Sequence, residues 1–110
     1  MRELKQGDII KLCLSPTKGH EQAGFRPAVV VSNNDFNALT KNKLICPITS
    51  TDRGYPAHVA LDNRTITHGF VMCDQIRTVT PASRDAEYIE SVPPDILDEI
   101  LDILHGLIEK

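Results

Sequence analysis

The chain has no tryptophan, and phenylalanine and tyrosine together make up only 5% of its 110 residues. Its core must therefore be aliphatic, and rings on which nucleic-acid bases could stack are scarce. Long apolar runs are also missing, and the first residues, MRELKQGD, lack the apolar segment of a signal peptide. From these absences we expect neither an exported nor a membrane-spanning protein but a cytoplasmic one.

Cysteine is sparse too: Cys13, Cys46 and Cys73 are odd in number and lie far apart. No cysteine or histidine pair has the spacing of metal ligands, so we expect free buried thiols and neither a metal nor a cofactor. An excess of positive charge is missing as well, since the net charge is −3. This argues against sequence-independent binding of nucleic acid but leaves room for a local basic groove.

What the chain does contain fits one globular domain over residues 1–110, with 41% hydrophobic and 25% charged residues. Asn33-Asn34-Asp35 can cap a short helical turn over 36–40. The missing amide hydrogen of Pro47 predicts that its strand ends there, at an edge or a bulge. Short β-forming segments are predicted at 8–14, 26–32, 43–48, 58–61, 69–73 and 75–80.

The last segment has helical periodicity and begins at Val92-Pro93-Pro94. Its apolar face, which we expect to close the open side of a barrel, comprises Ile96, Leu97, Ile100, Leu101, Ile103, Leu104, Leu107 and Ile108. Consecutive short strands with one terminal helix predict a mainly β protein. We expect a small, mostly antiparallel barrel or twisted sheet with short helices.

The segment from Pro16 to Ser32 is the first candidate site. It sets a polar loop, which contains His20, directly before Arg26-Pro27 and a run of small β-formers. Proline holds the preceding arginine in an extended conformation, and a guanidinium suits a phosphate or carboxylate. The alternative is a solvated hairpin in which Arg26 makes a structural ion pair with Glu21.

Two further stretches are candidates. The hydroxyls of Thr49, Ser50 and Thr51 could bind a phosphate oxygen or orient a ribose hydroxyl, but they could also cap a turn. Asp74 could be a general base, the partner of an arginine, or a turn aspartate. Arg53 and Arg77 could line a groove for an anionic substrate, or be solvated. His20 could titrate near neutral pH, or have no role.

Arg26, the Thr49–Thr51 hydroxyls, Asp74 and His20 form a set without metal ligands. Such groups suit phosphoryl chemistry in which positive charge offsets the charge developing on phosphorus. RNA carries its own nucleophile, the 2′-hydroxyl, so the protein need not supply one.

Four stretches, taken in order, resemble the MazF/PemK toxins of bacterial toxin–antitoxin modules. They are PTKGHEQAGFRPAVVVS, PITS, RGYP and CDQIRT, and the similarity extends from about Gly7 into the terminal helix. The resemblance implies an SH3-like barrel of the CcdB/PemK type and a homodimer. It also implies a metal-independent endoribonuclease that cleaves single-stranded RNA, typically mRNA, and leaves 2′,3′-cyclic phosphate and 5′-hydroxyl ends. The expected partner is an antitoxin with an acidic C-terminal tail that folds over the site.

Carried over residue by residue, Arg26 and Thr49 match the central catalytic pair of the family. His20 and Asp74 match acid–base or supporting positions of the PemK branch. That branch has an arginine two residues before the aspartate, where this chain has Met72, so the acid and base roles do not transfer whole. The resemblance implies RNA-binding roles for Glu21, Gln22, Phe25, Ser50, Thr51, Arg53, Gln75 and Arg77.

Two other functions stay open at this point. A CcdB-like poison would act without catalysis by binding a protein such as gyrase, and would depend on the terminal helix rather than on Arg26 and Thr49. A DNA-binding autoregulator is disfavoured by the net charge and by the lack of a helix-turn-helix pattern. Contact with DNA is therefore expected only through the antitoxin.

Overall fold

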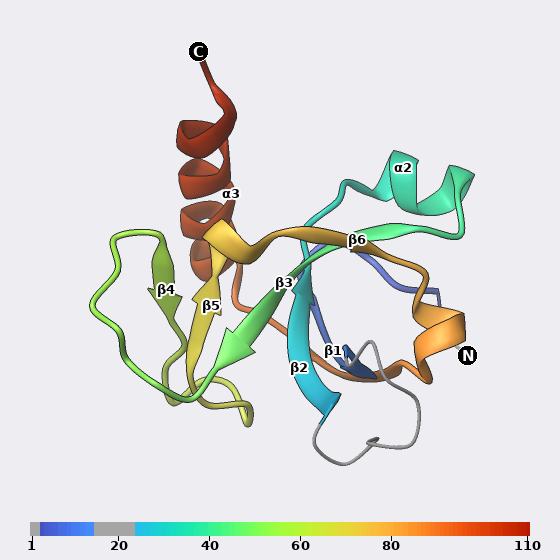
Figure 1. Ribbon diagram of the computed structural model, residues 1–110, viewed down its shortest axis with the longest axis horizontal. Coiled ribbons are helices and arrows are strands. Elements are labelled where there is room, and N and C mark those ends of the chain that lie inside the picture. The colour runs from blue at the N-terminus through green and yellow to red at the C-terminus, as the bar shows by residue number, and fades with distance from the viewer. Residues whose placement is uncertain (1–2, 15–23) are drawn as a thin grey trace.

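The computed structural model describes residues 3–14 and 24–110. In these residues the fold is a strongly bent antiparallel sheet with a C-terminal helix packed against it (Figure 1). The strands are β1 (Asp8–Cys13), β2 (Phe25–Val30), β3 (Lys43–Thr49), β4 (His58–Ala60), β5 (Phe70–Met72), β6 (Arg77–Val79) and β7 (Glu87–Ser91). The helices are α2 (Asn34–Leu39), α3 (Pro94–Ile108) and the 3-10 turns η1 (Cys73–Gln75) and η2 (Pro81–Arg84).

The strand order is β4-β5-β3-β2-β1-β7, and β6 also pairs with β3. The prediction of a mainly β, antiparallel fold with short helices and a terminal helix is confirmed. Each predicted strand segment contains a strand, and Asn33 caps α2 by accepting a hydrogen bond from the Phe36 amide. One strand, β7, was not predicted. It pairs with β1 and lies at the end of the strand order.

Strand β3 ends at Thr49, one residue beyond the predicted segment, but it is central in the sheet, so the prediction of an edge at Pro47 is wrong. On one side β3 pairs with β2. On the other side its first half pairs with β6, with Ile45 opposite Arg77, and its end pairs with β5, with Ile48 opposite Val71. Pro47 lies between these two pairings, at the point where the neighbour of β3 changes from β6 to β5. The amide hydrogen that proline lacks is therefore not needed for pairing with either strand.

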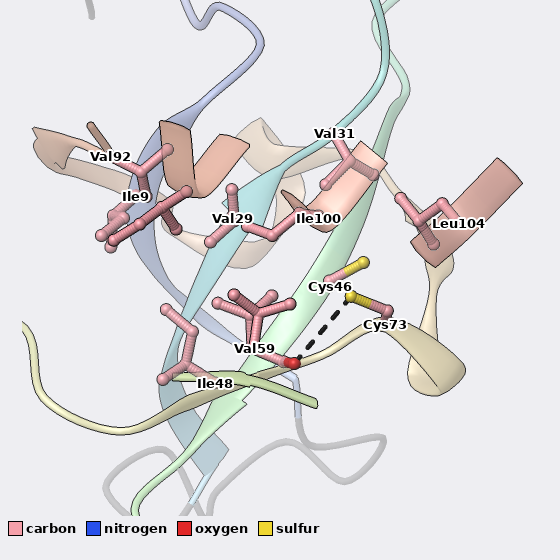
Figure 2. Packing of buried hydrophobic residues seen from close by; sticks show 12 residues of the cluster. Ile9, Val29, Val31, Cys46, Ile48, Val59, Cys73, Val92, Ile100 and Leu104 are labelled. Carbon is pink, nitrogen blue, oxygen red and sulfur yellow. Dashed lines mark hydrogen bonds between the residues drawn. The ribbon is translucent and has the colours of Figure 1, made fainter. Parts of the chain in front are cut away.

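Helix α3 packs on one face of the sheet, and its buried residues Ile96, Ile100 and Leu104 belong to the larger core cluster (Figure 2). The expectation that the whole apolar face is core is wrong at its end, because Leu107 and Ile108 are exposed. They lie beyond the last turn that reaches the sheet. The other face of β1, β2 and β3 packs a second cluster, comprising Leu4, Ile10, Leu12, Ala28, Val30, Ile45, Val79 and Ala86.

The cysteines are free, as predicted. Cys46 and Cys73 are fully buried in the larger core, although Cys73 lies in η1 rather than in a strand, and Cys13 is half-buried. A hydrogen bond with the Cys73 thiol, together with burial, raises the pKa of Cys46. Cys46 therefore remains a protonated thiol at neutral pH.

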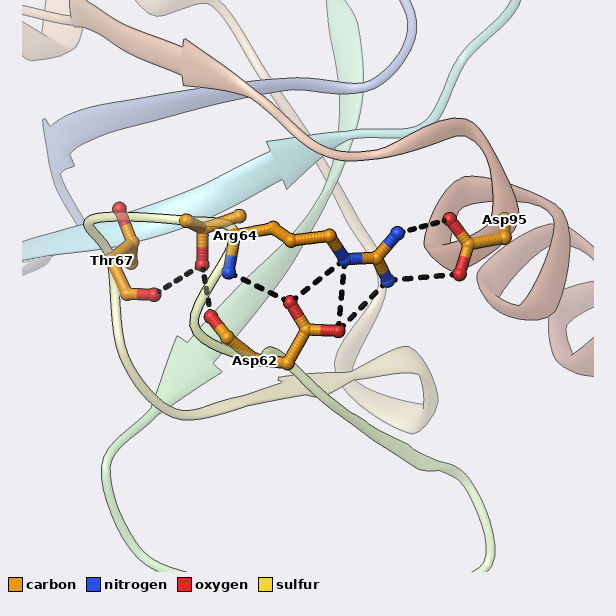
Figure 3. Close-up of polar contacts among 5 residues, drawn as sticks. Asp62, Arg64, Thr67 and Asp95 are labelled. Atoms are coloured by element: carbon orange, nitrogen blue, oxygen red, sulfur yellow. Dashed lines mark hydrogen bonds and ion pairs between the residues drawn. The ribbon is translucent and has the colours of Figure 1, made fainter.

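Arg64 ties the β4–β5 loop to the first turn of α3 (Figure 3). Its Nη1 and Nη2 donate to the two carboxylate oxygens of Asp95 at 2.8 and 2.9 Å, and its Nε and Nη2 donate to Asp62. The hydrogen bonds from Arg64 lower the pKa of both aspartates. The forked geometry joins two segments that are distant in sequence.

We expect Arg64→Ala to lower the midpoint of urea unfolding slightly at pH 7 and to have a smaller effect near pH 2. Both aspartates have a lower pKa when folded than when unfolded. Their contribution is therefore present above the unfolded pKa and is lost as the pH falls through the folded one. Urea titrations at both pH values, with the exposed Lys41→Ala as control, measure this. An equal loss at pH 7 and pH 2 would contradict an electrostatic role.

Candidate active site

Arg26 and Thr49 lie on the same face and at the same end of the sheet. Ala28 in β2 is directly opposite Pro47 in β3. Side chains two residues apart share a face of a strand, so Arg26 is on the side of Ala28 and Thr49 on the side of Pro47. Since the strands are antiparallel, the start of β2 and the end of β3 meet at one edge (Figure 1). Arg26 is exposed there and Thr49 is half-buried.

The Thr49 side chain is held by the turn that follows it. Its Oγ1 accepts a hydrogen bond from the backbone N–H of Thr51 at 3.2 Å. A hydroxyl that accepts in this way keeps its own hydrogen for donation to another acceptor. Ser50 and Thr51 are exposed in the turn. The turn-capping role and a phosphate-binding role for Thr49 are thus compatible.

A pocket of about 310 Å³ opens beside this edge, between β3, the loop 50–57, β4, β5 and η1. Three of the predicted site residues, Arg53, Asp74 and Gln75, line it. None of the other lining residues, Pro47, Tyr55, His58 and Met72, was predicted to be a catalytic or RNA-binding residue. The pocket therefore brings together the predicted Asp74, the positively charged Arg53 and His58, a histidine for which no role was predicted.

His58 and Asp74 are in contact in this pocket, with Nε2 of the histidine 3.2 Å from Oδ1 of the aspartate. The His58 side chain is 4% exposed and that of Asp74 is 33% exposed. The Tyr55 ring packs against the imidazole, with 5.0 Å between ring centroids. Only alternation in the short strand β4 could have indicated His58: Val59 is apolar and buried, which turns His58 away from the core.

The remaining predicted residues are more scattered. Arg77 is exposed in β6, opposite Ile45 and so on the same side of β3 as Thr49. Phe25 is half-buried and, by alternation, faces the other side of β2 from Arg26. His20, Glu21 and Gln22 lie outside the described residues, as does the alternative ion pair between Glu21 and Arg26.

Comparison with known proteins identifies the family. Residues 5–108 match the model of the family described as PemK-like, MazF-like toxin of type II toxin-antitoxin system. The chain belongs to this family. Endoribonuclease PemK of Escherichia coli is 36% identical to this toxin-family chain over 110 residues, which cover 96% of the chain and 83% of the relative. Endoribonuclease toxin MazF of Escherichia coli strain K12 is 37% identical over 102 residues, covering 93% and 91%.

A solved structure has the same fold as this PemK-like, MazF-like chain. A chain in the crystal structure of MazE-MazF from Deinococcus radiodurans superposes with a TM-score of 0.87 at 33% identity, covering 97% of both chains. The fold predicted from the resemblance is confirmed. The alternative of a CcdB-like poison is not favoured, because the matching family is that of PemK and MazF. In the described residues of this PemK-like, MazF-like chain, no helix is long and apolar enough to cross a membrane.

Proposed function

We propose that this chain is the toxin of a toxin–antitoxin pair, an endoribonuclease that cleaves single-stranded mRNA in the cytoplasm and so inhibits translation and growth. The observation that carries the proposal is the position of Arg26 and Thr49 on one face and edge of the sheet, near the pocket that holds Asp74. Its relatives in Escherichia coli are named endoribonucleases. Membership of the toxin family supports the same activity.

The proposed reaction is a transesterification within the RNA that needs no metal ion. The 2′-oxygen attacks the adjacent phosphorus as its proton leaves to a base, and the bond from phosphorus to the 5′-oxygen breaks. The 5′-oxygen takes a proton and leaves as a hydroxyl, and the other end keeps a 2′,3′-cyclic phosphate. Arg26 offsets the negative charge on the phosphorane, and Thr49 donates a hydrogen bond to a phosphate oxygen. Asp74 and His20 take part in proton transfer or support it.

The groove around this centre is proposed to bind the RNA. RNA is read in single strands through splayed bases, and a pocket of about 310 Å³ has room for one such base. Arg53 and Gln75 line that pocket. The other proposed RNA-binding residues are Glu21, Gln22, Phe25, Ser50, Thr51 and Arg77.

The proposed partners follow from the same family. The chain is inferred to act as a homodimer and to be inhibited by an antitoxin whose acidic tail occupies the groove. The Deinococcus radiodurans relative is described as MazE-MazF, which supports an antitoxin partner. Contact with DNA is proposed only through the antitoxin.

Incubation of the purified protein with a long RNA in EDTA tests the function. We expect cuts at defined sites with 5′-hydroxyl and 2′,3′-cyclic phosphate ends. A matched oligonucleotide with a single 2′-deoxyribose on the 5′ side of the scissile phosphate should not be cut, because it lacks the nucleophile. Absence of cleavage by folded protein, or cleavage of the deoxy-substituted oligonucleotide, would contradict the proposal.

A further inference from the structure

The strongest unassigned feature of the pocket is the pair of His58 and Asp74. In the β4–β5 register His58 is directly opposite Met72, so both side chains stand on the same face of the sheet. Both line the pocket, with Asp74 two residues beyond Met72. Met72 brings neither a charge nor a hydrogen-bond donor. The polar group next to Asp74 comes instead from the neighbouring strand, as the Nε2 of His58 at 3.2 Å from Oδ1.

The protonation of that nitrogen follows from its neighbour. A bare Nε2 would direct a lone pair at a carboxylate oxygen 3.2 Å away, which is repulsive. We therefore assign the ring N–H to Nε2, where it can be donated to this oxygen. Nδ1 is buried and has no hydrogen-bond partner among the described residues. Within that part of the chain, the polar contact recorded for the His58 side chain is the one to Asp74.

Packing alone does not explain a histidine at position 58. Burying a polar ring with one partnerless nitrogen costs free energy that an apolar side chain of similar size would not. The site nevertheless holds a histidine that is 4% exposed beside an aspartate that is 33% exposed. The buried ring is thus fixed, on one side by Tyr55, while the carboxylate it contacts reaches the open pocket.

We propose that His58 is a positioning residue for the RNA cleavage proposed above, on which this inference rests. Its Nε2–H fixes the orientation of the Asp74 carboxylate and keeps one of its oxygens engaged, which leaves the other oxygen for the RNA. His58 itself is buried and acts through Asp74.

The test compares two substitutions of similar size that differ in the donor. His58→Leu removes the donor, and His58→Gln keeps an N–H at the end of the side chain. On an RNA oligonucleotide with one cleavage site, we expect His58→Leu to lower kcat about 10- to 100-fold with little change in KM. We expect His58→Gln to stay within about threefold of wild type. The exposed His105→Gln on α3 is the matched control, with unchanged kcat.

The same substitutions in an Asp74→Asn background show whether His58 acts through the carboxylate. There His58→Leu should have little further effect on kcat. Thermal unfolding establishes that each variant is folded, and His58→Met serves as a second apolar variant if His58→Leu is not. Wild-type kcat in the folded apolar variant, loss of activity in His58→Gln equal to that in His58→Leu, or the same loss in both backgrounds would overturn the positioning role. If the wild type cleaves RNA in any of these cases, the proposed function stands; if it cleaves none, the proposed function itself fails.

Discussion

Arg26→Ala is expected to reduce RNA cleavage about 1,000-fold or more and to leave the fold intact. The guanidinium is the group proposed to bring a permanent positive charge to the phosphorane, and its forked donors match two phosphate oxygens. Arg26 is exposed at the start of β2, so removing its side chain leaves no cavity. Single-turnover cleavage of an RNA oligonucleotide measures the loss, and urea unfolding measures the stability.

Two controls make this result specific. Arg26→Lys keeps the charge but not the fork, and we expect it to recover only a small part of the rate. Lys11→Ala removes one positive charge from the adjacent strand β1, where Lys11 is paired with Pro27 and so faces the other side of the sheet from Arg26. It should leave the rate unchanged. Full activity of Arg26→Ala, or an equal loss in Lys11→Ala, would contradict a catalytic role of Arg26.

The fold was predictable wherever a segment buries a whole face. The apolar run Ala28–Val31 packs into both core clusters, and α3 places every third or fourth residue on the sheet, so each pattern is strong. β7 was missed because it lies at the end of the sheet, and its residues alternate between exposed and half-buried. The wrong prediction of an edge at Pro47 has a different reason. Its effect on pairing depends on which strand lies beside it, and this is a property of the tertiary fold.

The candidate active site also contains residues that the local sequence indicates and residues that only the tertiary fold brings together. Arg26 and Thr49 come from strands that are adjacent in the sequence and form a hairpin-like pair, so motif order indicated both. His58 reaches Asp74 only because β4 pairs with β5 in one register, and a three-residue strand has too little pattern to fix a register. A lone histidine at a strand end gives no such signal.

Gly69 lies close to the backbone of Thr49 at the end of β3, and we expect its replacement to have the largest effect on the free energy of unfolding. Its φ of +129° lies in a region that residues with a side chain rarely adopt. A methyl group built there would overlap the carbonyl oxygen of Thr49 and crowd the Cγ2 of Ile48. Because those atoms are a strand backbone and a buried side chain, neither can move without separating β5 from β3, which pair through Thr49 and Phe70.

We therefore expect Gly69→Ala to lower the free energy of unfolding by about 3 kcal/mol or more. The folded fraction should also lose cleavage activity, since Thr49 would have to shift away from Arg26. Gly54→Ala is the matched control: Gly54 has a φ of +65° but no atom within 4 Å of the added carbon, so only backbone strain of about 1–2 kcal/mol applies. Urea unfolding of both variants separates the two costs. If Gly69→Ala is no more destabilising than Gly54→Ala, the contact with Thr49 does not hold the end of β3 in place.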